Sequence, residues 1–263
     1  MVIMEGEIMN KWTKYINERF NLSNESGSFV VALAGNPNTG KSTVFNALTG
    51  MKQHTGNWPG KTVVQSQGSF ILNGQLCTLV DLPGTYSLLS TSLDELVARD
   101  FLCFANPDAT IVVTDATCLE RNLNLVLQVM EITKNVVVCV NLMDEAKRKN
   151  INIDLDKLSS ELGVPVVGTV ARNRKGLNNL MATVYKVATA AIEPNPRLTL
   201  YDDIIEKNIK EIEPSLDRLL KGRLNSRWVA LRLIEGDTTF LEGIKDYLSY
   251  FDADAEVKMT CVQ

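Results

Sequence analysis

The residues GNPNTGKS, at positions 35–42, decide the fold of this 263-residue chain. They match the pattern GxxxxGK followed by serine or threonine, and they lie between an apolar run at residues 29–34 and a helical run that begins at Val44. Such a loop wraps its backbone N–H groups around phosphates, and the positive end of the following helix faces them. The chain is therefore predicted to bind a nucleotide through a phosphate-binding loop, or P-loop.

Each part of the P-loop has an expected role. Lys41 is expected to reach the β and γ phosphates, and Ser42 to hold Mg²⁺ through its hydroxyl group. The predicted nucleotide contacts in this segment are Gly35, Asn36, Pro37, Asn38, Thr39, Gly40, Lys41, Ser42 and Thr43.

Short apolar runs alternate with helical patterns from residue 29 to about residue 190. The alternation predicts an α/β domain, with a mostly parallel sheet that carries helices on both faces. Six strands are predicted, at residues 29–34, 62–72, 75–81, 109–114, 135–141 and 164–168. Asn73-Gly74 predicts a tight hairpin between the second and the third strand, so that pair is expected to be antiparallel.

The sequence also indicates how the chain is divided. Apolar residues at helical spacing, followed by a polar string, predict an amphipathic helix and linker at residues 1–28. This helix either docks on the main domain or meets a membrane surface or a partner, and both alternatives stay open. The sheet domain is expected at 29–190, a proline-containing linker at 191–199, and a small all-α domain at 200–263 with breaks at Pro214, Gly222 and Gly236.

Composition and charge exclude several classes of function. With 27 basic and 31 acidic residues, the formal net charge of -4 argues against a nucleic-acid-binding surface. No apolar stretch approaches the roughly 20 residues that span a bilayer, and no secretory signal is apparent, so a cytosolic location is expected. The single histidine, His54, excludes a metal site with two imidazoles. The five cysteines lack CxxC spacing, and four have the apolar neighbours typical of buried thiols.

A second phosphate-binding segment follows the strand at 75–81. Asp81-Leu82-Pro83-Gly84 has the form DxxG, which is a common turn when it stands alone. After a P-loop, the end of this strand brings Asp81 to the same sheet edge as the phosphates. Asp81 is then expected to bind Mg²⁺ through water, and the N–H group of Gly84 to meet the γ phosphate.

Two later segments indicate a guanine base. Asn141 and Asp144 form an NxxD pattern, in which Asp144 can accept from the guanine N1–H and 2-amino groups; the alternative is a polar cap at a strand end. Val170 and Ala171 lie in a small-residue loop where a backbone N–H can meet guanine O6; the alternative is an ordinary loop. Leu142 stands where the common NKxD form has lysine, which indicates weak binding and fast release and leaves some use of ATP open.

The order of these motifs resembles that of translation-factor-like GTPases, with a Ras-like P-loop fold. Further segments narrow the resemblance to the FeoB family of bacterial ferrous iron transporters. These segments are GNWPGKTV at 56–63, DLPGTYSL at 81–88, SLDE at 92–95, RWVAL at 227–231 and EGD at 235–237.

This resemblance implies a GTPase switch whose nucleotide state gates Fe²⁺ uptake. The all-α domain would act like a guanine-nucleotide-dissociation inhibitor, and a membrane-spanning permease would follow residue 263. The expected location is the cytoplasmic face of the bacterial inner membrane, with this part of the protein soluble. GTP and GDP are the expected ligands, Mg²⁺ and an activating K⁺ the cofactors, and small accessory proteins or further copies the partners; nucleic acid is not expected.

The resemblance also implies roles for a first switch loop at 56–60 and the residues after it. Thr62 would close on Mg²⁺ and the γ phosphate, although it also suits the start of a strand, and Asn57, Pro59 and Gly60 would contact GTP. Asn38 and the carbonyls of Gly56 and Trp58 would hold K⁺, unless Asn38 only braces the loop. The implied catalytic set is Lys41, Gly56, Trp58, Thr62 and Gly84.

Hydrolysis without assistance is expected to be slow. Thr85 stands where small GTPases of the Ras type have a glutamine that orients the attacking water. A short hydroxyl side chain cannot reach as that amide does, so the rate is expected in the range of roughly 10⁻⁴ to 10⁻² per second. Trp58 is apolar in a loop that is expected to be exposed, so it either packs when the switch closes or touches a partner. His54 nearby is either solvated or an aid to catalysis.

Rival interpretations share part of this motif set. A ribosome- or RNA-associated GTPase would carry the same nucleotide motifs but should add a basic appendage, which the acidic balance disfavours. A P-loop kinase or ATPase would leave the NxxD pattern without a role. The helical tail alone could also be an interaction module.

Overall fold

The computed structural model describes residues 2–22, 27–50, 53–89 and 92–251. The chain forms two compact units, residues 1–197 and residues 198–263. The expected linker at 23–26 and Cys261 lie outside the described residues.

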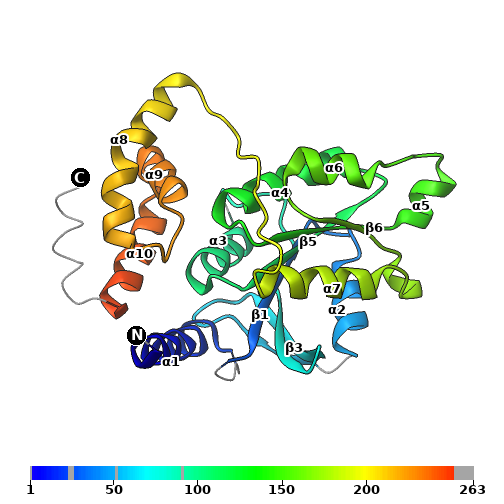
Figure 1. Ribbon diagram of the computed structural model, residues 1–263, viewed down its shortest axis with the longest axis horizontal. Helices are drawn as coiled ribbons and strands as arrows, with labels where there is room; N and C mark the ends of the chain where they lie inside the picture. The colour runs from blue at the N-terminus through cyan, green and yellow to red at the C-terminus, as the bar shows by residue number, and fades with distance from the viewer. Residues whose placement is uncertain (1, 23–26, 51–52, 90–91, 252–263) are drawn as a thin grey trace. The chain divides into compact units, whose positions relative to one another are not determined.

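A seven-stranded sheet forms the centre of the first unit, in the order β2-β3-β4-β1-β5-β6-β7 (Figure 1). The strand β1 is parallel to β4 and β5, and β6 is parallel to β5 and β7, whereas β3 is antiparallel to β2 and β4. The strands are β1 (Phe29–Gly35), β2 (Gln53–Asn57), β3 (Val64–Leu72), β4 (Gln75–Asp81), β5 (Ala109–Asp115), β6 (Val136–Asn141) and β7 (Val166–Gly168). The predicted α/β class and the antiparallel hairpin are confirmed.

The predicted number of six strands is wrong, because β2 was missed. Its sequence, QHTGN, has no apolar alternation, so it carries no strand signal of its own. It forms by backbone pairing with β3, from Gln53 opposite Gly68 to Asn57 opposite Val64. The strand expected at 62–72 begins at Val64, which leaves Thr62 in the connecting loop.

Helices cover both faces of the sheet (Figure 1). On one face, α2 and α7 pack on the central strands, and α4 with the π-helix η1 covers the other. The helical elements of this unit are α1 (Val2–Phe20), α2 (Lys41–Thr49), α3 (Leu93–Asp100), η1 (Phe101–Ala105), α4 (Leu119–Ile132), α5 (Met143–Arg148), α6 (Leu155–Leu162), η2 (Ala171–Asn173) and α7 (Leu177–Ala188).

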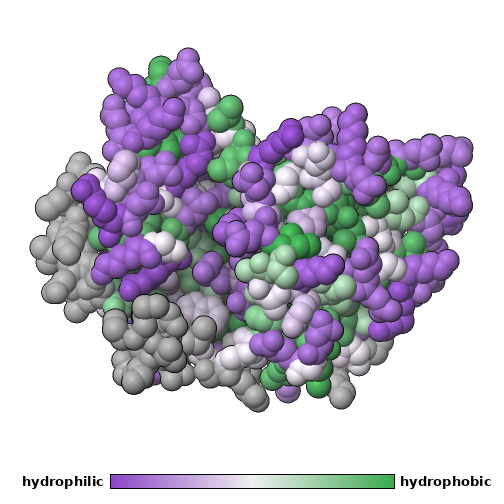
Figure 2. Space-filling view, in the orientation of Figure 1, coloured by the Kyte–Doolittle hydropathy of each residue, from purple (hydrophilic) through white to green (hydrophobic). Residues whose placement is uncertain are grey.

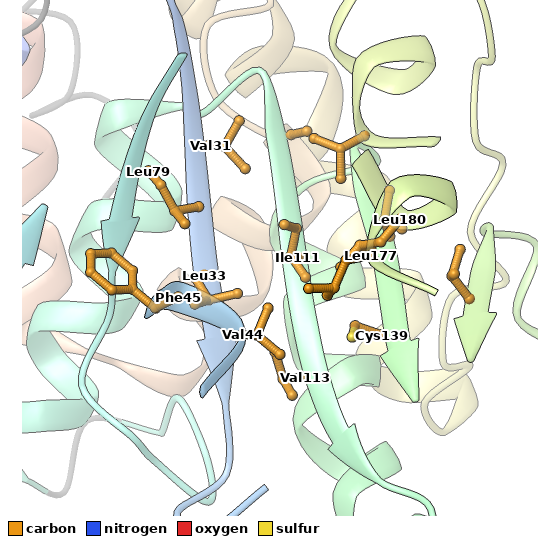
Figure 3. Packing of buried hydrophobic residues seen from close by; sticks show 14 of the residues in the cluster. Val31, Leu33, Val44, Phe45, Leu79, Ile111, Val113, Cys139, Leu177 and Leu180 are labelled. Atoms are coloured by element: carbon orange, nitrogen blue, oxygen red, sulfur yellow. The ribbon is translucent and has the colours of Figure 1, made fainter. Parts of the chain in front are cut away.

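The core under α2 and α7 is built from one side of each buried strand. Leu33 of β1 and Ile111 of β5 point toward Val44 of α2 and Leu177 of α7 (Figure 3). Successive strand residues point to opposite faces, so this core uses alternate positions of the apolar runs. Among the described cysteines, Cys77, Cys103 and Cys139 are buried and Cys118 is exposed.

Within the described part of the second unit, which ends at residue 251, the chain forms three helices, α8 (Asp203–Leu220), α9 (Ser226–Glu235) and α10 (Thr238–Phe251). Trp228 and Phe240 pack edge to face with ring centroids 4.6 Å apart. The expected break at Pro214 is wrong, because α8 continues through it. Ile209 and Leu216 are buried on either side of the proline, so packing of the apolar face offsets the lost backbone hydrogen bond.

None of the helices in the described ranges is both long enough and apolar enough to cross a membrane. On the face drawn in Figure 2, hydrophilic residues cover most of the surface and hydrophobic residues form small separate patches.

An ion pair between Glu206 of α8 and Arg227 of α9 joins two helices of the second unit. Arg227 donates from both terminal nitrogens to the carboxylate, at 2.9 and 2.6 Å, and the N–H group of Tyr201 donates to it at 3.1 Å. These hydrogen bonds, above all those from Arg227, lower the pKa of Glu206 to about 2.

We expect the stability of the second unit to fall in acid through this pair. Because the pKa of Glu206 is lower in the folded state, its contribution is present above the ordinary value of 4.5 and is lost as the pH falls toward about 2. Glu206→Gln should cost about 1–2 kcal/mol of unfolding free energy at pH 7. This is less than the ~1.5–3 kcal/mol typical of hydrogen bonds to a charged group, because both side chains are partly exposed to solvent. Urea unfolding at pH 7 and pH 3 measures this, followed by Trp228 fluorescence in a chain that carries Trp12→Phe and Trp58→Phe. An equal loss at both pH values would contradict it.

Candidate nucleotide-binding site

The P-loop connects β1 to α2 in a conformation that only some residues accept. Asn38 and Gly40 have φ angles of 66° and 82°, in the left-handed region. A Cβ atom on Gly40 would lie 2.4 Å from Nδ2 of Asn141, and one on Gly35 would lie 2.7 Å from the carbonyl oxygen of Val113. Both glycines are therefore required by close approach of the surrounding chain.

Lys41 and Asp81 lie together at this edge of the sheet. Lys41 Nζ donates to Asp81 Oδ1 and, at 2.7 Å, to the carbonyl oxygen of Leu82. Both side chains are mostly buried, with exposed fractions of 11% and 18%. Burial raises the pKa of Asp81, while the charge and the hydrogen bond of Lys41 act in the opposite direction. The predicted phosphate ligand and the predicted Mg²⁺ ligand are thus brought into contact.

Gly84 brings the DxxG segment against the P-loop. A Cβ atom built on Gly84 would lie 3.6 Å from Cα of Pro37, which is ordinary van der Waals contact. The backbone of Gly84 therefore borders the loop, as a contact to a terminal phosphate requires. Thr85, the next residue, is buried.

The remaining P-loop residues divide by exposure. Asn38, Ser42 and Thr43 are exposed, whereas Asn36 and Thr39 are buried. Thr39 Oγ1 donates to the carbonyl oxygen of Asn36 at 2.9 Å, which braces the turn. The amide atoms of Asn36 are buried and have no hydrogen-bond partner within the described ranges.

Asn141 joins the P-loop to the loop at residues 169–171. Its Nδ2 donates to the carbonyl oxygen of Thr39 at 3.1 Å, and its Oδ1 accepts from Thr169 Oγ1 at 3.1 Å and from the N–H group of Ala171 at 3.0 Å. Asn141 therefore works as a brace between two binding loops. Thr169 is a positioning residue that sequence reasoning missed, and its only signal was its place directly after a buried strand.

Asp144 is held by an arginine. Arg172 donates to Oδ2 of Asp144 at 2.5 Å, and it also lies 3.9 Å from the carboxylate of Glu145. Burial acts to raise the pKa of Asp144, but the hydrogen bond and charge of Arg172 outweigh it and the pKa is lowered. The other oxygen, Oδ1, is buried without a hydrogen-bond partner among the residues described. An ionised carboxylate with one free oxygen suits a base that presents N–H donors.

Sequence reasoning did not assign Arg172 this role, because its distance from Asp144 along the chain hides the pair. The loop that carries it is less free than expected. The N–H group of Val170 donates to the carbonyl oxygen of Lys175 at 3.0 Å, and that of Ala171 donates to Asn141. A contact from Val170 or Ala171 to guanine O6 stays a prediction. Either N–H group would have to leave its present acceptor or be shared between that acceptor and O6.

The expected switch segment is docked rather than free. Gly56 and Asn57 belong to β2, the carbonyl oxygen of Trp58 accepts from the N–H group of Lys61 at 2.9 Å, and the side chain of Trp58 is only 3% exposed. The loop around Trp58 is exposed at Pro59, Gly60 and Thr62, as expected, but the Trp58 side chain itself is already packed in this conformation. Its ring packs against Phe101, with centroids 5.5 Å apart. Distant aromatic residues of the same unit cover it, which local sequence does not reveal.

This conformation does not gather the expected K⁺ ligands. Asn38 lies in the P-loop, whereas Gly56 lies on the edge strand β2, three strand spacings or roughly 14 Å from β1. Pro59, Gly60 and Thr62 are exposed in the loop that follows β2. The oxygen atoms of Ser42, Asp81 and Thr62 are the donors that Mg²⁺ prefers, but Thr62 would have to approach the other two. His54 is exposed on β2, and within the described ranges no cluster of three histidine, cysteine or acidic side chains suits a metal ion.

Comparisons with known proteins agree on both units. The family model for ferrous iron transport protein B matches residues 29–184, and the model for the FeoB cytosolic helical domain matches residues 201–260. The Fe(2+) transporter FeoB of Escherichia coli (strain K12) is 40% identical over 214 residues, which cover 79% of this chain and 27% of that protein. The FeoB of Salmonella typhimurium (strain LT2) is 38% identical over 213 residues, with the same coverage. The chain spans about a quarter of the length of these relatives.

Solved structures give the same result. The cytosolic domain of T. maritima FeoB in GDP form II is 35% identical, covers 89% of this chain and 97% of that one, and has a TM-score of 0.73. The same domain in its GMPPNP form is 34% identical over the same shares, with a TM-score of 0.71. The cytosolic domain of L. pneumophila FeoB is 36% identical, covers 87% and 92% of the two chains, and has a TM-score of 0.72.

Proposed function

The chain belongs to the FeoB family of ferrous iron transport proteins, and on that premise we propose that it is the GTP-binding and GTP-hydrolysing module of a ferrous iron transporter. The observation that carries the proposal is the meeting of Lys41, Asp81 and Gly84 at the P-loop. The relatives solved in GDP and GMPPNP forms support guanine nucleotides as the ligands.

Each residue of the site has a separate role in GTP hydrolysis. Lys41 exchanges Asp81 for the β and γ phosphates when the nucleotide binds, and the N–H group of Gly84 orients the terminal phosphate. Ser42 and Asp81 would hold Mg²⁺, and Thr62 would join them when the switch closes. The ion would supply positive charge next to the phosphate oxygens. Asp144 recognises the base, positioned by Arg172. Thr85 offers no long amide for the attacking water, so turnover is slow.

Family membership supports a proposal for the place of this module in the cell. We propose that its nucleotide state gates Fe²⁺ movement through a permease of the same protein at the cytoplasmic face of the bacterial inner membrane. The domain limits of 29–190 and 200–263 are proposed with it, and the helical domain is proposed to slow nucleotide release. Family membership favours this role over that of a ribosome- or RNA-associated GTPase.

The test of hydrolysis is phosphate release from GTP by the purified chain with Mg²⁺, in KCl and in NaCl. We expect about tenfold faster release in KCl, equivalent to ~1.4 kcal/mol of transition-state stabilisation. A monovalent cation held by Asn38 and the carbonyls of Gly56 and Trp58 would stabilise the charge that develops on the bridging oxygen.

Asn38→Asp is the matched variant for the cation site, and it should remove the advantage of KCl. Equal rates in the two salts, or an unchanged ratio in Asn38→Asp, would contradict the K⁺ site while leaving GTP hydrolysis itself in place. No phosphate release in either salt would contradict the proposed function.

A further inference from the structure

Helix α1 contacts the segment that the proposed function requires to move. It lies outside residues 29–184 and 201–260, which the two family models match. We propose that α1 is an autoinhibitory clamp, which holds the switch segment at residues 56–62 away from the P-loop and opposes the GTP-bound conformation. This inference rests on the proposed function.

An aromatic cluster forms the centre of the clamp. Phe20 at the end of α1, Trp58 of the switch segment and Phe101 of η1 are all buried. Each pair packs edge to face, with centroid distances of 6.3 Å for Phe20 to Trp58, 5.5 Å for Trp58 to Phe101 and 5.1 Å for Phe20 to Phe101. Pairs of this kind stabilise beyond the burial of their area. The indole ring of Trp58 therefore packs against Phe20 of α1 and against Phe101 of η1.

Hydrogen bonds attach the end of α1 to the strand that pairs with the switch segment. Gln65 Nε2, on β3, donates to the carbonyl oxygen of Phe20 at 2.7 Å, and Gln67 Nε2 donates to that of Asn21 at 3.1 Å. The last carbonyls of a helix lack partners within it, so these amides satisfy them. Gly56 on β2 lies beside the same helix end, since a Cβ atom there would be 3.9 Å from Nδ2 of Asn21.

A second contact holds the other end of the segment. Lys61 Nζ lies 3.8 Å from a carboxylate oxygen of Asp100, the last residue of α3. Both side chains are partly exposed, so this ion pair adds little stability but fixes the direction of the loop. The segment is thus attached on both sides of Trp58.

Burial of Trp58 in the docked state has a free-energy cost that favours its release from the cluster. Nε1 of Trp58 is buried and, among the described residues, has no acceptor. A buried N–H group without a partner loses its hydration, which offsets part of the gain from burying the ring. Movement of Trp58 out of the cluster restores that hydration. Two positions of the segment can therefore lie close in free energy.

GTP and α1 compete for this segment. Closure needs Thr62 and the carbonyls of Gly56 and Trp58 at the P-loop, but β2 lies three strands from β1. Trp58 has to leave Phe20 for that movement. Contacts that exist only in the docked state lower the affinity for any ligand that requires the other state. GDP lacks the γ phosphate that Thr62 would meet, so its binding should not depend on α1.

The test measures nucleotide affinity in the full 263-residue chain. Phe20→Ala removes the aromatic pair between α1 and Trp58 together with the pairs of Phe20 with Tyr15 and Phe101. We expect this variant to tighten binding of GMPPNP about tenfold and to change GDP affinity less than about twofold.

Phe29→Ala is the matched control. Phe29 pairs edge to face with Tyr185, with ring centroids 6.3 Å apart. Phe29 begins β1, whereas the P-loop begins at the last residue of that strand, so this variant removes an aromatic pair away from the P-loop. We expect this control to leave both affinities unchanged.

A second variant removes attachment without creating a cavity. Gln65→Leu keeps the buried volume but leaves the carbonyl oxygen of Phe20 without its donor, so it should tighten GMPPNP binding about threefold. This variant decides the matter if circular dichroism shows that Phe20→Ala is unfolded. A third readout is Trp58 emission in the chain that carries Trp12→Phe and Trp228→Phe, where it is the sole tryptophan. The emission should shift to longer wavelength with GMPPNP but not with GDP.

The outcomes separate this inference from the proposed function. If the unmodified chain fails to bind GMPPNP, the proposed function is wrong and the clamp falls with it. If the chain binds GMPPNP but Phe20→Ala and Gln65→Leu leave the affinity unchanged, the clamp alone is overturned. Unchanged Trp58 emission at saturating GMPPNP would also overturn it. Equal tightening by Phe29→Ala would mean that general loosening of the domain causes the effect.

Discussion

Lys41→Ala is expected to lower the rate of GTP hydrolysis at least about 100-fold, because removal of one preorganised charged or hydrogen-bonding group from a transition state typically costs ~2.7–4 kcal/mol. Lys41 is the cation in direct contact with Asp81 at the P-loop, and its side chain is 11% exposed. Water cannot replace a buried cation at that position without reorganising. Single-turnover phosphate release measures the loss at saturating GTP, so that weaker binding does not mask it.

Two controls separate lost chemistry from lost structure. Lys186→Ala removes an exposed lysine in the last turn of α7 and should leave the rate unchanged. Thermal unfolding of Lys41→Ala checks the fold, because the variant leaves the buried carboxylate of Asp81 without its partner. Loss of that cation lets burial raise the pKa of Asp81 further, and uptake of a proton limits the cost. A folded variant with a rate within about tenfold of the original chain would contradict the role of Lys41.

The parts of the fold that the sequence predicts well are those with strong local signals. A few adjacent residues are enough to predict the conformation of three segments. These are the apolar run before the P-loop, the glycines of the loop and the hairpin at Asn73-Gly74. β2 could not be predicted in this way, because its polar residues form a strand only through pairing with β3. The predicted break at Pro214 was wrong for a related reason, because packing of α8 overrides a local helix-breaking signal.

The site shows the same division between local and distant information. Lys41, Asp81 and Gly84 are found together because strand ends of a parallel sheet meet at one edge. The burial of Trp58 depends on Phe20 and Phe101, and no spacing along the chain indicates that contact. The order of the motifs therefore predicts the phosphate site well, but it predicts the position of the switch poorly, because the switch depends on its neighbours.

Base recognition gives the second large effect. Asp144→Asn is expected to weaken GDP binding at least about 100-fold, because the carboxylate accepts two hydrogen bonds from the base and hydrogen bonds to a charged group are the stronger ones. An amide at the same place turns one of its two groups into a donor, which then faces a donor of guanine. Asp156→Asn, on the exposed face of α6, removes the same charge outside the site and should have no effect.

Exchange of the base tests the geometry rather than the charge alone. Xanthine has a carbonyl where guanine has its 2-amino group, so the amide of Asp144→Asn should accept xanthosine diphosphate better than GDP, and the original chain should prefer GDP. Because Arg172 lowers the pKa of Asp144, the carboxylate stays ionised above pH 5, and GDP affinity should not vary with its titration between pH 5 and pH 8. Titration calorimetry with GDP, ADP and xanthosine diphosphate measures the affinity for each base.

Leu142 in place of a stacking lysine predicts weak affinity, but it does not remove the discrimination by Asp144. Comparable affinities of the original chain for GDP and ADP would therefore contradict guanine recognition and favour an ATP-using P-loop enzyme.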